Sequence, residues 1–310
     1  MANAKGGWKG SLASILKQHN GSKVDGSVAS YATQYKRSSV LFSSFKELRT
    51  LGYKIDSVTQ FKGKHFDALV RSWSARGLSS STIQNRISVF RVFCKWVGKD
   101  GMIQRYEKQI RESGISRRSM VADNDRSWSA AGVDVQKKIG EVSAQDKRVG
   151  IQLELQRAFG LRARESMQLR PHQADKGHYL AVSHGTKGGR DRVVEIGNKY
   201  QRDVLDRAKA LASKNGSTID PKKNLSQWKN HYYRVIRSHG ITRDSGFTSH
   251  GLRHERLNEV YKEVTGNLSP VQGGGKVDRE IDNFARQEVA EVAGHSRSSI
   301  SSAYLGSGRR

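Results

Sequence analysis

Only three prolines occur among the 310 residues, and apolar side chains recur at the spacing of a helix face through much of the chain. Proline breaks helix interiors, so a chain this poor in it can be helical over most of its length. In the first half the pattern predicts a helix from Val28 to Gly52, a second over 60–75, and a third that follows the serines 79–81 and ends at Gly98. The first of these would bury one stripe of side chains, namely Val28, Tyr31, Tyr35, Phe42, Phe45 and Leu48. These helices predict a small bundle with a basic exterior.

The second half alternates between helical stretches and two short strands. The strands are expected over 179–183 and 192–196, with Thr186 to Arg190 as a tight hairpin turn between them. Helices are expected over 144–158, 200–213, 225–238, from 249, over 280–293 and from 298. The fold class is therefore mainly α with a small β-sheet. The predicted boundaries are a basic flexible arm over 1–26, a helical domain over 27–115, a linker over 116–130 and a mixed α/β domain over 131–310.

The charge balance indicates a polyanionic partner. The formal net charge is +26 and the pI is about 10.3, and DNA or RNA is the commonest partner of such a surplus. A membrane is the alternative, but no apolar run approaches the ~20 residues that a span needs. A secretory signal is not evident, and Cys94 is the only cysteine, so no intrachain disulfide forms and a cytoplasmic setting is expected.

A spaced set of basic side chains ends in a tyrosine close to the carboxyl end: Arg162, Lys187, His250, Arg253, His295 and Tyr304. Such a set could surround a phosphodiester with cations and hydrogen-bond donors, while the tyrosine supplies an oxygen nucleophile. No carboxylate cluster or cysteine–histidine spacing predicts a metal, and no cofactor is expected. The stretch from Gly273 to Lys276 lacks the spacing of a phosphate-binding loop.

Each member of this set also has an ordinary structural interpretation, such as a solvated arginine, a surface lysine in a turn or a packed terminal tyrosine. In the functional interpretation Arg162 binds a non-bridging phosphate oxygen, because a guanidinium can donate two hydrogen bonds to one phosphate. Glu165 would hold the Arg162 side chain in place from the side opposite the phosphate. Lys187 could act as a general acid toward a departing 5′ oxygen. The spacing of His250 and Arg253 places both on one helix face.

Together, the motifs resemble those of the tyrosine recombinase (phage integrase) family. They are Gly-Leu-Arg-x-x-Glu at 160–165, Lys-Gly-Gly at 187–189, His-x-x-Arg-His at 250–254, Gly-His-Ser at 294–296 and Tyr304. The resemblance covers roughly 140–304 by motif. The helical first half is compatible with the core-binding domain of that family, and the second half with its catalytic domain.

The resemblance implies a mechanism in which Tyr304 attacks the scissile phosphate, forms a 3′-phosphotyrosyl ester and frees a 5′ hydroxyl. Arg162 and Arg253 would hold phosphate oxygens, Lys187 would protonate the 5′ oxygen, His250 would accept the tyrosine proton and His295 would donate a hydrogen bond to phosphate. Neither ATP nor a metal is needed. The expected partner is double-stranded DNA at specific recombination sites, gripped by a C-shaped clamp in a homotetramer that passes through a Holliday junction.

Some features depart from the family pattern or leave alternatives open. The stretch around 262–282 is longer than usual and the tail after Tyr304 is short, so either that insertion or the N-terminal arm could supply the contact between subunits. A topoisomerase IB-like or resolvase-type enzyme uses the same chemistry, and a non-catalytic DNA-binding clamp is an alternative from another class. The DNA target and any accessory DNA-bending proteins are not legible in the sequence.

Overall fold

The computed structural model describes residues 7–23, 26–106, 110, 119–186 and 189–308. Two compact units divide the chain, unit 1 over 1–119 and unit 2 over 120–310. Both are mainly helical, and the only sheet within the described residues has two strands. The predicted fold class is confirmed, while the arrangement of the two units as a clamp stays a prediction.

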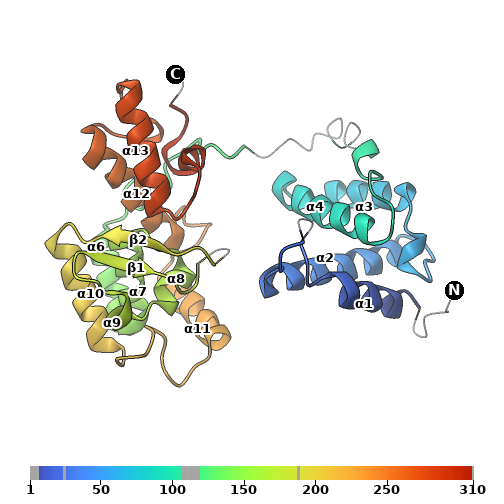
Figure 1. Cartoon of the computed structure of the whole chain (residues 1–310), viewed down its shortest axis with the longest axis horizontal. Helices are drawn as coiled ribbons and strands as arrows, with labels where there is room; N and C mark the ends of the chain where they lie inside the picture. Colours follow the sequence, from blue (N-terminus) through green and yellow to red (C-terminus); the bar gives the residue numbers. More distant parts are fainter. Residues whose placement is uncertain (1–6, 24–25, 107–109, 111–118, 187–188, 309–310) are drawn as a thin grey trace. The chain divides into compact units, whose positions relative to one another are not determined.

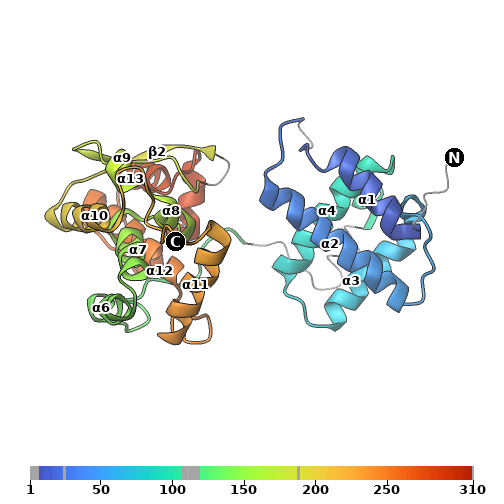
Figure 2. The same cartoon turned by 90° about the horizontal axis from the view of Figure 1, so that it is seen from below.

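Unit 1 is a bundle of helices connected by short loops (Figure 2). Its elements are α1 (Gly7–His19), α2 (Tyr31–Thr50), η1 (Val58–Gln60), α3 (Gly63–Ala75), α4 (Ser80–Trp96) and η2 (Gln104–Tyr106). Ser79 caps α4, since its side chain accepts a hydrogen bond from the backbone of Thr82. The three helices predicted for this half are confirmed in order as α2, α3 and α4, and α1 is an additional helix.

Aromatic rings fill the core of unit 1. Phe61 stacks on Phe90 with ring centroids 5.1 Å apart, and Phe45 meets both Phe61 and Phe93 edge to face. All four rings are essentially excluded from solvent. Their burial, together with offset and edge-on ring contacts, stabilises the bundle.

Two predictions for this half are wrong. Residues 7–19 of the expected flexible arm form α1, which buries Trp8, Leu12 and Leu16 in the core of unit 1, because these side chains recur at helical spacing among the glycines and lysines. Residues 1–6 of that arm lie outside the described residues. The stripe assigned to the first helix also fails at its start, where Val28, Tyr31 and Tyr35 are exposed at 83%, 91% and 76%.

Unit 2 surrounds its central helix α7 with helices on several sides (Figure 1), and its β-hairpin lies at the edge of the unit that is at the top in Figure 2. Its elements are α6 (Val135–Gln145), α7 (Lys147–Phe159), α8 (Ala163–Gln168), α9 (Pro171–Ala174), β1 (Tyr179–Val182), β2 (Arg192–Glu195), α10 (Lys199–Leu211), α11 (Leu225–Ser238), α12 (Ser249–Thr265), η4 (Pro270–Gln272), α13 (Arg279–Val292), η5 (Ser298–Ser301) and α14 (Ser302–Leu305). Helix α7 contacts α6, α8, α10, α11 and α12.

One helix predicted in unit 2 is interrupted. The periodic stretch 144–158 was expected to be continuous, but Asp146 separates α6 from α7. The Asp146 carboxylate accepts hydrogen bonds from the backbone amides of Arg148 and Val149, so it starts a new helix instead of continuing the old one. Gly150 allows the two helices to pack closely, because a Cβ there would meet the Ser143 side chain.

The hairpin is confirmed as an antiparallel pair. Tyr179 pairs with Glu195 and Val182 with Arg192. The connection runs over 183–191, which is longer than the tight turn that was expected, and residues 187–188 within it lie outside the described residues. The alternation along β2 buries Val194 and turns Arg192 inward on the same face.

The predicted linker over 116–130 does not end where expected. Trp128 is fully buried in unit 2, and its indole nitrogen donates to the backbone oxygen of Thr248 at 2.7 Å. Ala122 donates its backbone amide to Ser302. The later part of the stretch is therefore packed structure, while 116–118 lie outside the described residues. No helix in the described part of the chain is long and apolar enough to span a membrane.

Candidate active site

Arg162 stands at the turn between α7 and α8. Gly160, with φ of +61°, ends α7 in the left-handed conformation that glycine adopts without strain. Glu165 closes the start of α8, because its Oε2 accepts from the Arg162 backbone nitrogen at 2.7 Å. The Arg162 side chain bonds Glu165 Oε1 at 2.6 Å and the backbone oxygen of Ala293 at 2.9 Å. The local sequence thus places this guanidinium beside Glu165, and the distant Ala293 oxygen helps to fix the direction in which it points.

Arg253 lies on α12 with no solvent-exposed surface. Its Nε donates to the phenol oxygen of Tyr304 at 3.1 Å, its Nη2 donates to the backbone oxygen of Ala293 at 2.5 Å, and its Nη1 donates to the backbone oxygen of Gly160. Burial lowers the pKa of the guanidinium to about 10, so it keeps its charge at neutral pH. Since Arg162 bonds the same Ala293 oxygen, the two guanidiniums lie in one site.

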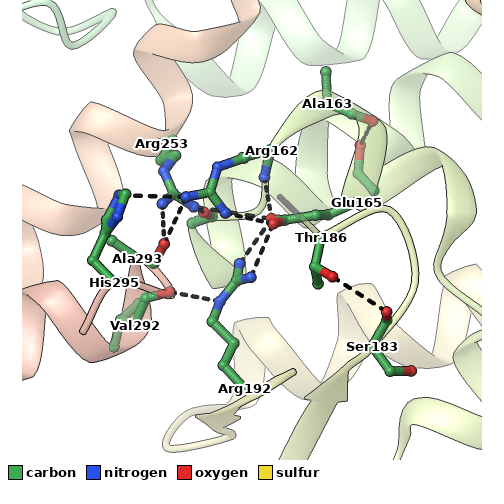
Figure 3. A network of polar contacts seen from close by, with 12 residues as sticks. Arg162, Ala163, Glu165, Ser183, Thr186, Arg192, Arg253, Val292, Ala293 and His295 are labelled. Carbon is green, nitrogen blue, oxygen red and sulfur yellow. Dashed lines mark hydrogen bonds and ion pairs between the residues drawn. The ribbon is translucent and has the colours of Figure 1, made fainter. Parts of the chain in front are cut away.

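Glu165 is the anion at the centre of this cationic site, and it is fully buried (Figure 3). It bonds both Arg162 and Arg192, and Arg253 Nη1 lies 4.0 Å from its Oε2. Burial alone would raise the pKa of this carboxyl, but hydrogen bonds and charge from Arg192, and then from Arg162, lower the pKa to about 2. The carboxylate is therefore ionised and can keep several cations together.

His295 and Tyr304 complete the site from the carboxyl end of the chain. His295 follows α13 by way of Gly294, whose φ of +65° turns the chain, and its Nε2 lies 3.3 Å from Arg162 Nη2. Tyr304 lies on α14 and is 7% exposed, with its ring centroid 6.4 Å from that of His295. Arg253 also lies over the tyrosine ring, 5.4 Å from the centroid.

Two histidines on α12 flank the tyrosine ring. The His254 ring lies 4.9 Å from that of Tyr304 and the His250 ring 6.2 Å from it. His254 is 2% exposed, and its burial lowers its pKa to about 3. His250 keeps an exposed face, yet burial of the rest of the ring, followed by the charges of Arg253 and Arg162, lowers its pKa as well. Both rings are thus neutral at pH 7.

The structure brings together Arg162, Glu165, His250, Arg253, His295 and Tyr304 from four separate segments of the chain. Lys187 lies outside the described residues. Arg192 is a member of the network that the sequence interpretation missed. The signal was present in the alternation of β2, which turns this arginine to the same side as the buried Val194. No three His, Cys, Asp or Glu side chains in the described part of the chain are grouped so as to hold a metal ion.

Two family models match the chain. The model described as "Integrase" matches residues 118–259, and the model described as "Phage integrase, N-terminal" matches residues 18–103. A search of curated proteins finds no match. The chain belongs to the tyrosine recombinase (phage integrase) family.

Solved structures share the fold at low sequence identity. A lambda integrase dimer bound to a COC' core site aligns with a TM-score of 0.60 at 14% identity, covering 96% of this chain and 77% of that one. The Tn1549 transposon integrase in complex with a circular intermediate DNA aligns with a TM-score of 0.60 at 11% identity, covering 96% and 95%. A lambda integrase tetramer bound to a Holliday junction gives 0.59 at 14% identity, covering 99% and 80%.

Proposed function

We propose that this chain is a site-specific DNA recombinase that cuts and rejoins strands through a 3′-phosphotyrosyl intermediate. The observation that carries the proposal is the position of the Tyr304 phenol, 3.1 Å from a buried guanidinium that shares the Ala293 oxygen with Arg162. A nucleophile and two cations in one site match the needs of an attack on a phosphodiester.

In the proposed reaction the Tyr304 oxygen attacks phosphorus and the bond to the 5′ oxygen breaks. The phenol proton leaves to a base and the departing 5′ oxygen gains a proton, so the products are a tyrosyl ester and a 5′ hydroxyl. When a 5′ hydroxyl of a partner strand attacks the ester, the strands are exchanged. The energy of the bond is conserved, and neither ATP nor a metal enters the steps.

The arginines would stabilise charge on the non-bridging oxygens, and each well-placed donor contributes about 3 kcal/mol to such a transition state. Arg162 is the partly exposed member, with 21% of its side chain accessible, whereas Arg253 has no exposed surface. A phosphate that contacts Arg253 must therefore displace the Tyr304 phenol from it. That displacement would also free the phenol oxygen to attack.

Proton transfer would involve His250 and Lys187. A free tyrosine is only about 0.1% phenolate at pH 7, so a base is needed. His250 is the proposed base, because its ring lies beside that of Tyr304, with centroids 6.2 Å apart, and a neutral imidazole can accept the proton. Lys187 is proposed to protonate the 5′ oxygen, and His295 to donate to a phosphate oxygen.

The proposed partner is double-stranded DNA bound at specific sites by a homotetramer in the cytoplasm. The net charge of +26 supports a large phosphate contribution to affinity, which should make binding fall steeply with salt. The lambda integrase tetramer on a Holliday junction supports the same assembly here. Either the 262–282 insertion or the N-terminal arm is the proposed subunit contact; deletion of 268–278 that leaves synapsis unchanged in a gel-shift assay would contradict a role for the insertion.

A nicked half-site duplex tests the proposed function. The nick lets the released strand diffuse away, so a covalent protein–DNA adduct accumulates. Tyr304→Phe should bind the duplex but form no adduct, whereas Tyr179→Phe, at an exposed tyrosine of β1, should form it at the normal rate. An adduct with Tyr304→Phe would refute the assignment of the nucleophile.

The same substrate, together with a supercoiled plasmid, separates the alternatives. Transfer of the trapped strand to a second duplex supports a recombinase or resolvase, while relaxation of supercoils without transfer supports a topoisomerase IB-like enzyme. Specific binding with no adduct from the wild-type chain would support a non-catalytic DNA-binding clamp.

A further inference from the structure

Arg192 is the least expected member of the polar network shown in Figure 3. It begins β2, and its side chain is only 5% exposed. Its Nη1 and Nη2 donate to the two oxygens of Glu165 at 3.0 and 2.8 Å, and its Nε donates to the backbone oxygen of Val292 at 2.8 Å. One guanidinium thus joins three segments: the hairpin, the start of α8 and the end of α13.

Glu165 divides its hydrogen bonds evenly between two arginines. Oε1 accepts from Arg162 Nη1 and Arg192 Nη1, while Oε2 accepts from the Arg162 backbone nitrogen and Arg192 Nη2. The two hydrogen bonds from the Arg192 guanidinium fix the orientation of the Glu165 carboxylate, and the same two oxygens also accept from Arg162. The direction of the Arg162 guanidinium therefore depends on a carboxylate whose orientation Arg192 fixes.

Arg192 also packs against the turn that carries His295. A Cβ built on Gly294 would lie 2.9 Å from Arg192 Cδ and 3.2 Å from its Nη1, so the side chain lies directly along this turn. The hydrogen bond to the Val292 oxygen fastens the turn at its start. His295 in turn lies 3.3 Å from Arg162. Both ends of the Arg162–His295 contact are thus attached to the same guanidinium.

We infer that Arg192 is a positioning residue for strand cleavage, which holds Arg162 and His295 at the separation needed to grip one phosphate. The inference rests on the proposed function. All three side-chain nitrogens of Arg192 are engaged, two by the Glu165 carboxylate and one by the Val292 oxygen, so a phosphate bound to Arg192 would have to displace a buried carboxylate. Lysine at this position would keep the positive charge but could not donate the paired hydrogen bonds to Glu165. The variant Arg192→Lys therefore tests whether the hydrogen-bond geometry matters in addition to the charge.

The test compares cleavage of two nicked half-sites in single-turnover reactions with the full chain. One carries an ordinary scissile phosphodiester, and the other a methylphosphonate, in which a methyl group replaces one charged oxygen and lessens the need for a gripping cation. Arg192→Lys should slow cleavage of the phosphodiester about 10- to 100-fold, the usual effect of a supporting residue behind a functional ligand. The loss should be smaller on the methylphosphonate, as it should be for Arg162→Ala.

A matched control is Arg157→Lys, which alters another paired arginine of unit 2. Arg157 binds Glu259 on α12 through both terminal nitrogens and takes no part in the network around Glu165. Arg157→Lys should change the melting temperature without changing the ratio of the cleavage rates on the phosphodiester and the methylphosphonate. Equal losses on both substrates for Arg192→Lys, or a wild-type rate, would overturn the inference.

A second variant covers the case in which Arg192→Lys does not fold. The pair Arg192→Gln with Glu165→Gln removes one cation and one anion together, so the net charge of the interior does not change. A folded double variant that cleaves slowly supports a positioning role, and one that cleaves at the wild-type rate contradicts it. Absence of any adduct from the wild-type chain is a different result, because it refutes the proposed function itself.

Discussion

Both units have apolar cores, but the site of unit 2 adds a charged interior that the aromatic core of unit 1 lacks. The centre of unit 1 is a set of mutually packed rings, including Phe45, Phe61 and Phe90. The centre of the site in unit 2 contains Glu165 and Arg253, both with no exposed surface. Unit 1 is thus stabilised by removing apolar surface from water, whereas unit 2 carries ions that water would hold more favourably.

The difference teaches what the charged interior is for. A buried ion pair seldom adds net stability compared with apolar packing, because desolvation offsets the attraction between its members. Unit 2 nevertheless keeps a carboxylate beside three arginines, and its side-chain contacts orient the guanidiniums of Arg162 and Arg192. The contrast predicts that changes in the aromatic core of unit 1 act on stability alone, while changes in the charged centre of unit 2 act on stability and chemistry together.

The largest effect is expected from Arg253→Ala. The change removes a donor to Tyr304 and leaves the backbone oxygens of Gly160 and Ala293 short of a partner in the interior. Adduct formation should fall about 100- to 1000-fold or more, and the free energy of unfolding should fall by about 3–5 kcal/mol. Single-turnover cleavage and urea unfolding measure the two effects. An adduct rate within tenfold of wild type would contradict the role of this residue.

Next comes Phe61→Ala in the core of unit 1, which should lower the free energy of unfolding by about 3–5 kcal/mol through lost burial and a cavity. Cys94 reports the change, since its burial raises the pKa of the thiol to about 12 and keeps it unreactive in the folded state. Thiol labelling should accelerate, while hydrogen exchange of α7 stays unchanged. Faster exchange in α7 would show that the two units do not unfold independently.

Acid should weaken unit 2 more than unit 1. The pKa of His254 is about 3 in the folded state against an ordinary value near 6.5, so the unfolded chain takes up a proton that the folded chain refuses. This contribution is complete above pH 6.5 and is lost as the pH falls toward 3, by about 1.4 kcal/mol per pH unit. Glu165 adds loss in the same direction below about pH 4.5. Unit 1 has a weaker counterpart in His65, whose pKa burial also lowers.

Calorimetry at pH 7, 6 and 5 can measure this difference. The unfolding transition whose midpoint changes in Arg253→Ala belongs to unit 2, and the one whose midpoint changes in Phe61→Ala belongs to unit 1. The melting temperature of unit 2 should change more with pH than that of unit 1. His254→Gln should reduce that pH dependence. Equal shifts of both transitions would contradict the assignment of the acid-sensitive group.

The smallest effect is expected at a surface ion pair of unit 1. Arg71 bonds Asp67 one helical turn away, and the arginine side chain is 74% exposed. Arg71→Ala should change the free energy of unfolding by no more than about 0.5 kcal/mol, because solvent screens such pairs. Urea unfolding in low and high salt measures it. A loss above about 2 kcal/mol would contradict the expectation that an exposed ion pair contributes less to the free energy of unfolding than a buried one.

Much of the fold was legible because its signals are local. The serines before α4 and the glycine after it predicted the ends of that helix. The alternation of apolar residues predicted both strands of the hairpin. The failures were also local conflicts. The glycines and lysines before residue 20 masked the stripe of Trp8, Leu12 and Leu16, and Asp146 acted as a cap inside a continuous periodic stretch.

Sequence spacing alone determined which residue types could act on a phosphodiester and that they belong to a recognisable family pattern. It also determined a mainly helical chain, since periodicity and the scarcity of proline are properties of the chain itself. Only the tertiary structure decided that Arg162 and Arg253 share the Ala293 oxygen and that Arg192 lies behind Glu165. Those contacts join residues between 27 and 131 positions apart, and their geometry is set by the packing of the hairpin, α12 and α13 around α7, which no local pattern encodes.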